Sequence, residues 1–381
     1  MSRTVPRKAA VARLGMIGVA AMSSVALGAA TRGGGGHGRA AEPQRPHPAL
    51  SAARSLQRQL ARDFHHPFHV RQGRNFIEIY DTTPLFASQR MTYLQEAHAS
   101  FYDYFNLRLI HARPLPHRLL VLLFKQRKNF LSYARNVDHA DMAWAAGYYS
   151  QRTNRVAFYD DSTGRSAMAV DKLDRQLRKS LRTLARRERS ATLNREPDLA
   201  AALARQRSAT ARKLLFINNY AHFALQRINR AKTIHEACHE LSFNSGIQKR
   251  GVDYPFWLSE GLATSFEETD SPARINRGRL AVFLKARNSH QMIPLKTLIS
   301  RQPGAHVTIA TLSTYYGESW ALFYYFYGHD RRSLEKLLLL YRRQIPGRII
   351  PPKRQLAFFQ RCFGDHLARL NRRWLRTFKR Y

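Results

Sequence analysis

In one part of this chain hydrophobic and polar positions alternate in short runs, a pattern that predicts strands. From about residue 50 to 165 the pattern indicates strands at Asn75 to Tyr80 and Arg118 to Phe124, with an amphipathic helix near Phe86 to Tyr104. Two further strand candidates, Tyr148-Tyr149 and Val156 to Tyr159, flank a polar, turn-rich stretch and predict a β-hairpin. Residues 49–165 are therefore expected to form an α+β lobe.

The pattern becomes helical after this lobe. Residues 166–214 are rich in Arg, Lys, Ala, Leu and Glu and predict long surface helices that form a basic insertion. This insertion is expected to be a solvated arm, with a docking surface for an anionic partner as the alternative. Residues 215–381 are predicted to form a mostly helical lobe, with breaks at Gly246 to Pro255, Ile293-Pro294, Gln302 to Gly304 and Ile345 to Pro352.

The N-terminal residues carry the features of an export signal. Basic residues between Met1 and Arg13 precede an apolar stretch, Leu14 to Ala30, that ends in small residues, so residues 1–30 are expected to be a signal peptide. An uncleaved N-terminal anchor is the alternative, because the apolar stretch is long for a signal core. Residues 31–48 are rich in glycine and proline and predict a flexible linker. The protein is therefore expected to be secreted or periplasmic.

The net charge of the chain is strongly positive, with 63 Lys and Arg against 26 Asp and Glu, a formal charge of +37. Such a charge favours contact with anionic polymers, lipids or nucleic acids. The arginines are scattered over the whole chain, and no RNA-binding, zinc-finger or basic-helix motif organises them. An arginine-rich coding bias expressed on solvated faces is one interpretation, and non-specific contact with an anionic cell-surface polymer or lipid is the other. Specific recognition of nucleic acid is not expected.

One stretch combines residues that bind metal ions with a residue that activates water. Between Thr233 and Glu240 the sequence reads Thr-Ile-His-Glu-Ala-Cys-His-Glu. Helical residues four apart share a face, so His235 and His239 are expected to point at one ion. Glu236 would lie beside them, where a carboxylate could take a proton from a water molecule. A carboxylate ligand from outside this stretch would complete the site, and two imidazoles with a carboxylate suit zinc. One Zn²⁺ per chain is therefore the predicted cofactor.

Apolar residues inside this motif support the helix. Ile234, Cys238 and Leu241 are spaced to face a core, and Gly246 is suited to end the helix. Cys238 is accordingly expected to be a buried thiol rather than a metal ligand or a redox switch. Only one other cysteine, Cys362, is present, which excludes a disulfide scaffold.

A catalytic zinc needs a third protein ligand, and Glu260 is the candidate. It follows Pro255, a residue suited to the first turn of a helix, so Glu260 should lie about one turn into a helix packed on the first. A carboxylate behind a ligating histidine fixes the orientation of the imidazole ring. Glu267 is expected to do so from two turns further along the same helix, with Glu268 as the competing candidate. An ordinary exposed glutamate at this position is the alternative.

These two motifs resemble those of known peptidases. The segment Trp257-Leu258-Ser259-Glu260-Gly261-Leu262-Ala263 is similar to the Trp-Leu-Asn-Glu-Gly-Phe-Ala motif of gluzincin aminopeptidases. More closely, residues 228–268 resemble a secreted bacterial family called domain of unknown function 1570, in which a histidine–glutamate motif precedes Pro-x-Trp-x-x-Glu-Gly-Leu-Ala-x-x-Phe-Glu. The resemblance implies an α+β, zincin-like (gluzincin) fold, with a small mixed α/β N-terminal lobe and a mostly helical C-terminal lobe that holds the catalytic site.

The resemblance extends to a tyrosine. Residues 315–322 are similar to the gluzincin pattern Tyr-x-x-[Gly/Ser]-x-Ala-Leu, which implies that Tyr316 stabilises the oxyanion, with Tyr315 as the alternative. The Gly-x-Met-Glu-Asn strand of the aminopeptidases is absent from the sequence, which favours an endopeptidase. Val156 to Tyr159 is a candidate for the sheet edge that pairs with an extended peptide, although a buried strand would have the same pattern.

The expected function is therefore that of a secreted zinc metallopeptidase acting on peptides or proteins, with Glu236 as the general base. A non-catalytic metal-binding module, used for adhesion to anionic polymers, is the alternative. This alternative does not explain why a glutamate suited to act as a general base lies beside the histidines. A nucleic-acid-binding protein is a third class, and only the charge supports it.

Overall fold

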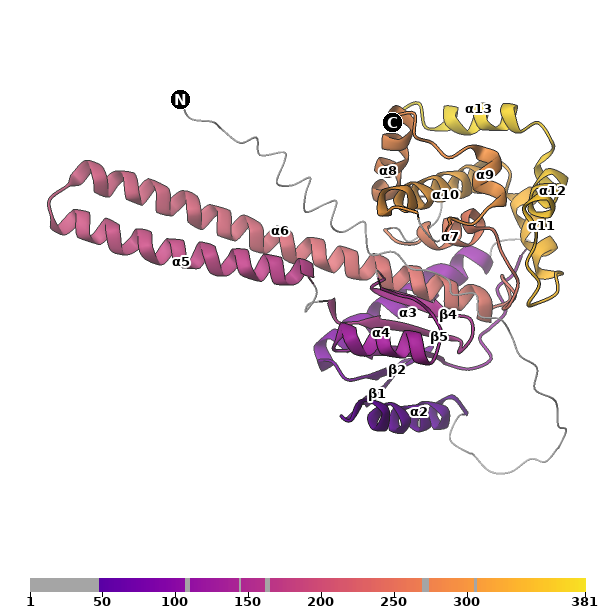
Figure 1. Ribbon diagram of the computed structural model, residues 1–381, viewed down its shortest axis with the longest axis horizontal. Coiled ribbons are helices and arrows are strands. Elements are labelled where there is room, and N and C mark those ends of the chain that lie inside the picture. Colours follow the sequence, from indigo (N-terminus) through magenta and orange to yellow (C-terminus); the bar gives the residue numbers. More distant parts are fainter. Residues whose placement is uncertain (1–47, 107–109, 144, 162–164, 269–273, 305–306) are drawn as a thin grey trace. The chain divides into compact units, whose positions relative to one another are not determined.

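The computed structural model describes residues 48–106, 110–143, 145–161, 165–268, 274–304 and 307–381 (Figure 1). The expected signal peptide and the linker up to residue 47 lie outside the described residues. The strands are β1 (His69–Gln72), β2 (Phe76–Tyr80), β3 (Leu119–Phe124), β4 (Gly147–Ser150) and β5 (Arg155–Tyr159). The helices are α2 (Pro48–Phe64), α3 (Pro84–Asn106), α4 (Arg127–Asn136), α5 (Arg165–Leu193), α6 (Pro197–Asn244), α7 (Phe256–Thr264), α8 (Arg277–Asn288), α9 (Leu295–Ser300), α10 (Ile309–His329), α11 (Arg331–Arg342), α12 (Pro352–Phe363) and α13 (Leu367–Thr377).

The architecture is mixed α/β, and the elements predicted in the N-terminal part are confirmed. The two predicted strands correspond to β2 and β3, the amphipathic helix to α3, and the hairpin to β4 and β5. None of the helices in the described ranges is long and apolar enough to cross a membrane.

One mixed sheet has the strand order β1-β2-β3-β5-β4. Strands β2, β3 and β5 are parallel to one another. At one edge β1 pairs antiparallel with β2, and at the other β4 pairs antiparallel with β5. The expectation that Val156 to Tyr159 forms the edge is wrong, because β5 pairs with β3 on one side and with β4 on the other. Of the two hairpin strands, β4 lies at the edge of the sheet. Both strands of a hairpin show the same alternation of apolar and polar residues, so this pattern does not indicate which strand lies at the edge. Pairing with a third strand decides it.

The two faces of the sheet pack against different helices, as the alternation of side chains along each strand requires. Ile77, Ile79 and Tyr148 belong to a cluster that includes residues of α2 and α4. Phe76 and Tyr149 point the other way, into the main core with α3 and the last part of α6. The last part of α6 therefore lies on one face of the sheet, and α4 packs on the other.

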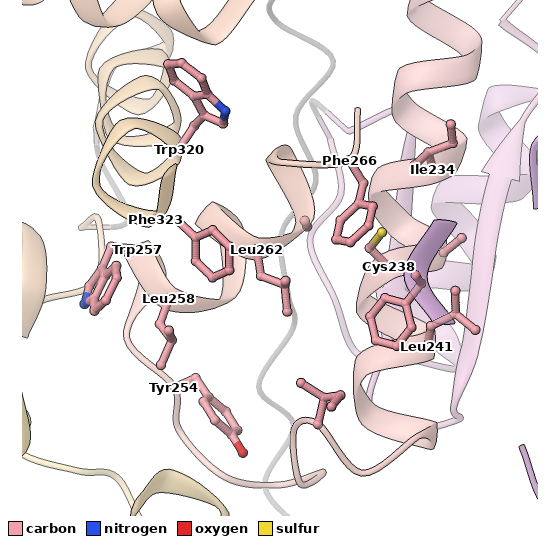
Figure 2. Close-up of a cluster of buried hydrophobic side chains, with 14 of the residues drawn as sticks. Ile234, Cys238, Leu241, Tyr254, Trp257, Leu258, Leu262, Phe266, Trp320 and Phe323 are labelled. Carbon is pink, nitrogen blue, oxygen red and sulfur yellow. The ribbon is translucent and has the colours of Figure 1, made fainter. Parts of the chain in front are cut away.

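The last part of α6 also packs against the C-terminal helices. Its predicted core positions, Ile234, Cys238 and Leu241, are buried with residues of α7 and α10 in one cluster (Figure 2). Cys238 is fully buried, and burial raises the pKa of its thiol well above the usual range. The burial of Cys238 agrees with the prediction that it is a buried thiol of the core.

Contacts divide the chain into two compact units. One contains the segment up to Tyr159 together with Arg230–Tyr381, and the other is Asp160–Asn229. The second unit, here called the arm, consists of α5 and the first part of α6, which run side by side (Figure 1). The arm has a small core of Leu184, Ala191 and Leu203. It continues beyond the stretch 166–214 that composition indicated, because α6 remains helical after its arginine-rich part ends.

Candidate metal centre

The centre is built on the last turns of α6. His235 and His239 lie one turn apart on the same face, and their Nε2 atoms are 3.2 Å from each other. Both side chains are buried. Two imidazole nitrogens at this distance need either a shared proton or a cation between them, since two lone pairs facing each other repel.

A carboxylate from α7 completes a set of three donors. Glu260 Oε2 is 3.1 Å from His235 Nε2, and Glu260 Oε1 is 3.4 Å from His239 Nε2. Glu260 is the fifth residue of α7, about one turn in, and Pro255 is the N-cap rather than a residue of the first turn. Gly261 lets α10 approach, because a Cβ atom at this position would lie 2.6 Å from the Ser319 carbonyl oxygen.

The spacing of the three donors fits a tetrahedral zinc ion. Bonds of about 2.1 Å at tetrahedral angles place two ligand atoms about 3.4 Å apart. The two imidazole Nε2 atoms are 3.2 Å apart, and each lies at a similar distance from a different oxygen of Glu260, 3.1 Å from Oε2 for His235 and 3.4 Å from Oε1 for His239. Ligand atoms of His235, His239 and Glu260 all lie within 4.8 Å of one another, and no other such group occurs among the described residues.

Glu236 lies next to the first histidine and is buried, with its side chain incompletely paired. Within the described part of the chain, its Oε1 atom has no hydrogen-bond partner. Burial raises the pKa of Glu236 to about 8, although the positive charge of His235 and a hydrogen bond with the Tyr149 main chain oppose this. A buried oxygen without a partner is costly, and Oε1 is available to accept a hydrogen bond from a ligand or a water molecule. Tyr149 belongs to the edge strand β4.

Glu267 contacts the other nitrogen of His235, but not from the position predicted for it. Its Oε1 atom is 2.9 Å from His235 Nδ1. The expectation that Glu267 continues the helix of Glu260 is wrong, because α7 ends at Thr264 and the following main-chain hydrogen bonds join residues three apart. This tighter turn places Glu267, and not Glu268, against the imidazole. Glu268 instead accepts a hydrogen bond from Gly278 N.

Two residues that hold the Glu267 side chain in place were not predicted from the sequence. Arg279 Nε donates to Glu267 Oε2 over 2.7 Å, and its Nη2 donates to Oε1. Asn276 Nδ2 donates to Glu267 Oε2 over 3.0 Å and to the Thr264 carbonyl oxygen over 2.9 Å. Asn276 is the N-cap of α8 and Arg279 lies in its first turn. A cap residue can be recognised locally, but nothing local distinguishes Arg279 from the other arginines of this chain.

The charges in the centre favour a bound cation. Burial opposes ionisation of Glu260 and Glu267, yet charges and hydrogen bonds from neighbouring residues, the two histidines for Glu260 and Arg279 with His235 for Glu267, together lower both pKa values to about 2. Burial also disfavours the charged form of His235, but its hydrogen bonds with Glu260 and Glu267 raise its pKa to about 10. Two ionised carboxylates thus surround the imidazoles, and they stabilise positive charge whether a proton or a metal ion supplies it.

Tyr316, and not Tyr315, lies beside the metal-ligand candidates. Its buried ring is 6.0 Å from the His235 ring, measured between centroids, and the Arg279 guanidinium lies 5.1 Å from its centroid. Burial raises the pKa of the Tyr316 phenol well above its usual range, so the group keeps its proton and remains a hydrogen-bond donor. Gly317 allows α8 to approach, since a Cβ atom there would be 2.8 Å from Val282 Cγ1.

Comparison with known proteins gives one match. No curated protein and no solved structure matches the chain. The model of a family described as "Protein of unknown function (DUF1570)" matches residues 229–346, a segment that contains His235, His239, Glu260 and Tyr316. The match supports the family name that the two sequence motifs suggested, over that segment of the chain.

Proposed function

We propose that the protein is a zinc-dependent metallopeptidase of the gluzincin type. One observation carries this proposal: His235, His239 and Glu260 bring ligand atoms within 4.8 Å of one another, close enough to hold one zinc ion, and Glu236 lies beside them with a buried oxygen that has no partner in the described residues. A site that served only to hold a metal would not need this carboxylate.

Zinc, when bound, lowers the pKa of coordinated water and polarises a carbonyl group. His235, His239 and Glu260 would hold the ion, and Glu267 would orient the ring of His235 through its Nδ1–H. Glu236 would take the proton of the water molecule that adds to the scissile carbonyl carbon. It would return that proton to the amine nitrogen as the C–N bond breaks. The Tyr316 hydroxyl would donate a hydrogen bond to the oxyanion.

The edge strand supports a peptide as the substrate. β4 is paired only on its β5 side within the described sheet, and its residue Tyr149 forms the main-chain hydrogen bond with Glu236. An extended peptide pairing with β4 would therefore run past the general base. Recognition through the main chain suits an endopeptidase, which has no need to recognise a free terminus. Export through an N-terminal signal, as the sequence predicts, belongs to the same proposal.

The test combines metal content with cleavage of an unfolded protein mixture. The purified chain should contain one zinc ion, lost in His239→Ala and retained in His117→Ala, whose histidine is exposed outside the site. Glu236→Gln should keep the zinc and lower turnover by about 10² to 10⁴-fold, the usual contribution of a general base. Zinc without any cleavage would instead establish the non-catalytic metal-binding module. A chain that binds no metal would contradict both functions.

A further inference from the structure

A row of aromatic side chains is exposed on the arm. Phe216 and Phe223 of α6 are 57% and 60% exposed, and Tyr220 lies between them. The rings of Phe216 and Tyr220 are stacked with their centroids 5.8 Å apart. Large apolar side chains are seldom exposed in a row on a helix, because leaving them in water forfeits the free energy of burial.

The row lies on the side of α6 that faces away from α5. Leu214 is buried, and Asn218 Nδ2 donates to Asp174 of α5 over 3.1 Å, so these positions face the partner helix. With about 3.6 residues per turn, Phe216, Tyr220 and Phe223 lie on the opposite side of the helix. The packing of the two helices of the arm therefore leaves these rings uncovered.

Arginines continue this row at both ends. Arg205 and Arg212 precede the aromatic residues on the same helix face and are exposed. Arg227 follows them, with its guanidinium 6.0 Å from the centroid of the Phe223 ring. We call the row Arg205, Arg212, Phe216, Tyr220, Phe223 and Arg227 the aromatic stripe. It extends over about 33 Å at 1.5 Å per residue.

The charge around the stripe defines the partner that it fits. Between Asp198 and Glu236 the sequence of α6 contains no acidic residue, and residues 160–229 contain 15 Lys and Arg against 7 Asp and Glu. A second copy of the arm would bring like charges together, which disfavours pairing of two stripes. An anionic surface would neutralise the arginines instead.

We propose that the aromatic stripe docks the arm onto the surface of an anionic phospholipid bilayer. The helix would lie in the plane of the surface, with the rings of Phe216 and Phe223 between headgroups and acyl chains and the arginines on the phosphates. A lipid surface fits better than a soluble anionic polymer, because a polymer would neutralise the arginines but leave the aromatic rings in water. This docking is independent of the proposed peptidase activity.

Binding of the full chain to vesicles tests the stripe. The vesicles contain equal parts of phosphatidylcholine and phosphatidylglycerol, with pure phosphatidylcholine as the uncharged comparison. The variant Phe216→Ser/Phe223→Ser should bind the anionic vesicles about tenfold more weakly, since it loses two apolar groups from the interface. The matched control Leu193→Ser/Leu199→Ser removes two exposed leucines of the arm outside the stripe and should bind as the unmodified chain does. Far-ultraviolet circular dichroism verifies that both variants remain helical.

A local probe separates the stripe from the apolar residues 14–30, which all variants share. In Phe216→Trp, acyl chains carrying bromine should quench the added fluorescence in anionic vesicles. Such quenching, together with weaker binding of the serine variant, supports the proposal. Equal binding of the serine variant and the unmodified chain, or an absence of additional quenching in Phe216→Trp, would overturn it. Equal binding that high salt abolishes would assign the attachment to charge alone.

Discussion

The two parts of the 48-residue helix α6 differ in what they bury and what they expose. From Lys232 to Phe243 every side chain is buried, including those of His235, Glu236, His239 and Glu240. In the arm, only Leu203 and Leu214 are buried among the described side chains of α6, while Leu215, Phe216 and Phe223 are exposed. The same helix therefore buries ionisable groups at one end and exposes aromatic ones at the other.

Both ends depart from the ordinary rule that apolar groups are buried and charges are exposed. Burying several ionisable groups costs free energy unless they are paired or bind a ligand, and exposing aromatic rings forfeits the gain of burial. Residues that weaken stability in this way often belong to functional sites. We therefore place chemistry at the buried end of α6 and surface binding at the exposed end.

Truncating a core leucine in the buried part should have the largest effect on stability. Leu241 is fully buried between the sheet and the C-terminal helices. Leu241→Ala should lower the free energy of unfolding by about 2 to 5 kcal/mol, through lost burial and the cavity that remains. Denaturant titration followed by circular dichroism measures this change. A loss below 1 kcal/mol would show that the end of α6 is not part of the cooperative core.

Removing the arginine that holds Glu267 should weaken metal binding. Arg279→Met takes away both guanidinium hydrogen bonds to Glu267, so the carboxylate orients the His235 ring less well. Zinc affinity should fall by about 10 to 100-fold, as is common for residues behind a metal ligand. Competition with a chromophoric chelator measures the affinity. Arg277→Met, at the exposed start of α8, is the matched control and should leave it unchanged. Equal affinities of the two variants would contradict the role of Arg279.

The sheet beneath the buried part of α6 should give stability a dependence on pH. Burial raises the pKa of Glu78 on β2 to about 8, although Arg71 and Arg90 oppose this, whereas the unperturbed value is 4.5. Between these values the folded chain keeps a proton that the unfolded chain releases, so the free energy of unfolding decreases as pH rises. Glu78→Gln should remove this contribution, on the order of 2 kcal/mol.

Denaturant titrations at pH 5 and pH 8.5 measure the contribution of Glu78. The difference in stability between Glu78→Gln and the unmodified chain should shift in favour of the variant at the higher pH. Asp103→Asn on α3 changes an exposed carboxylate and serves as the control. A difference that is independent of pH would show that Glu78 is ionised in the folded chain.

The smallest effect is expected in the exposed part of α6. Leu215 is 63% exposed, so Leu215→Ala should change the free energy of unfolding by no more than about 0.5 kcal/mol. The substitution is the counterpart of Leu241→Ala on the same helix and is measured in the same titration. A loss comparable to that of Leu241→Ala would mean that this face of the arm is covered in the folded protein, and the contrast between the two parts of α6 would disappear.

Much of the local structure could be predicted from the sequence, because short spacings determine it. Residues four apart on a helix share a face, so His235 and His239 could be paired before their distance was known. Alternation of apolar and polar residues indicated β2, β3 and the hairpin. The motif around Glu260 indicated a second helix, and the structure brings its carboxylate to the two histidines.

Only the tertiary structure determined features that depend on contacts between distant segments. β5 became an inner strand because β3 pairs with it, and Glu267 reached His235 through a tight turn after α7. Arg279 lies in the centre because α8 packs beside α10, where Gly317 leaves room for α8. Periodicity along a chain specifies which face a side chain occupies. Which partner that face meets is decided by packing and strand pairing between segments far apart in sequence.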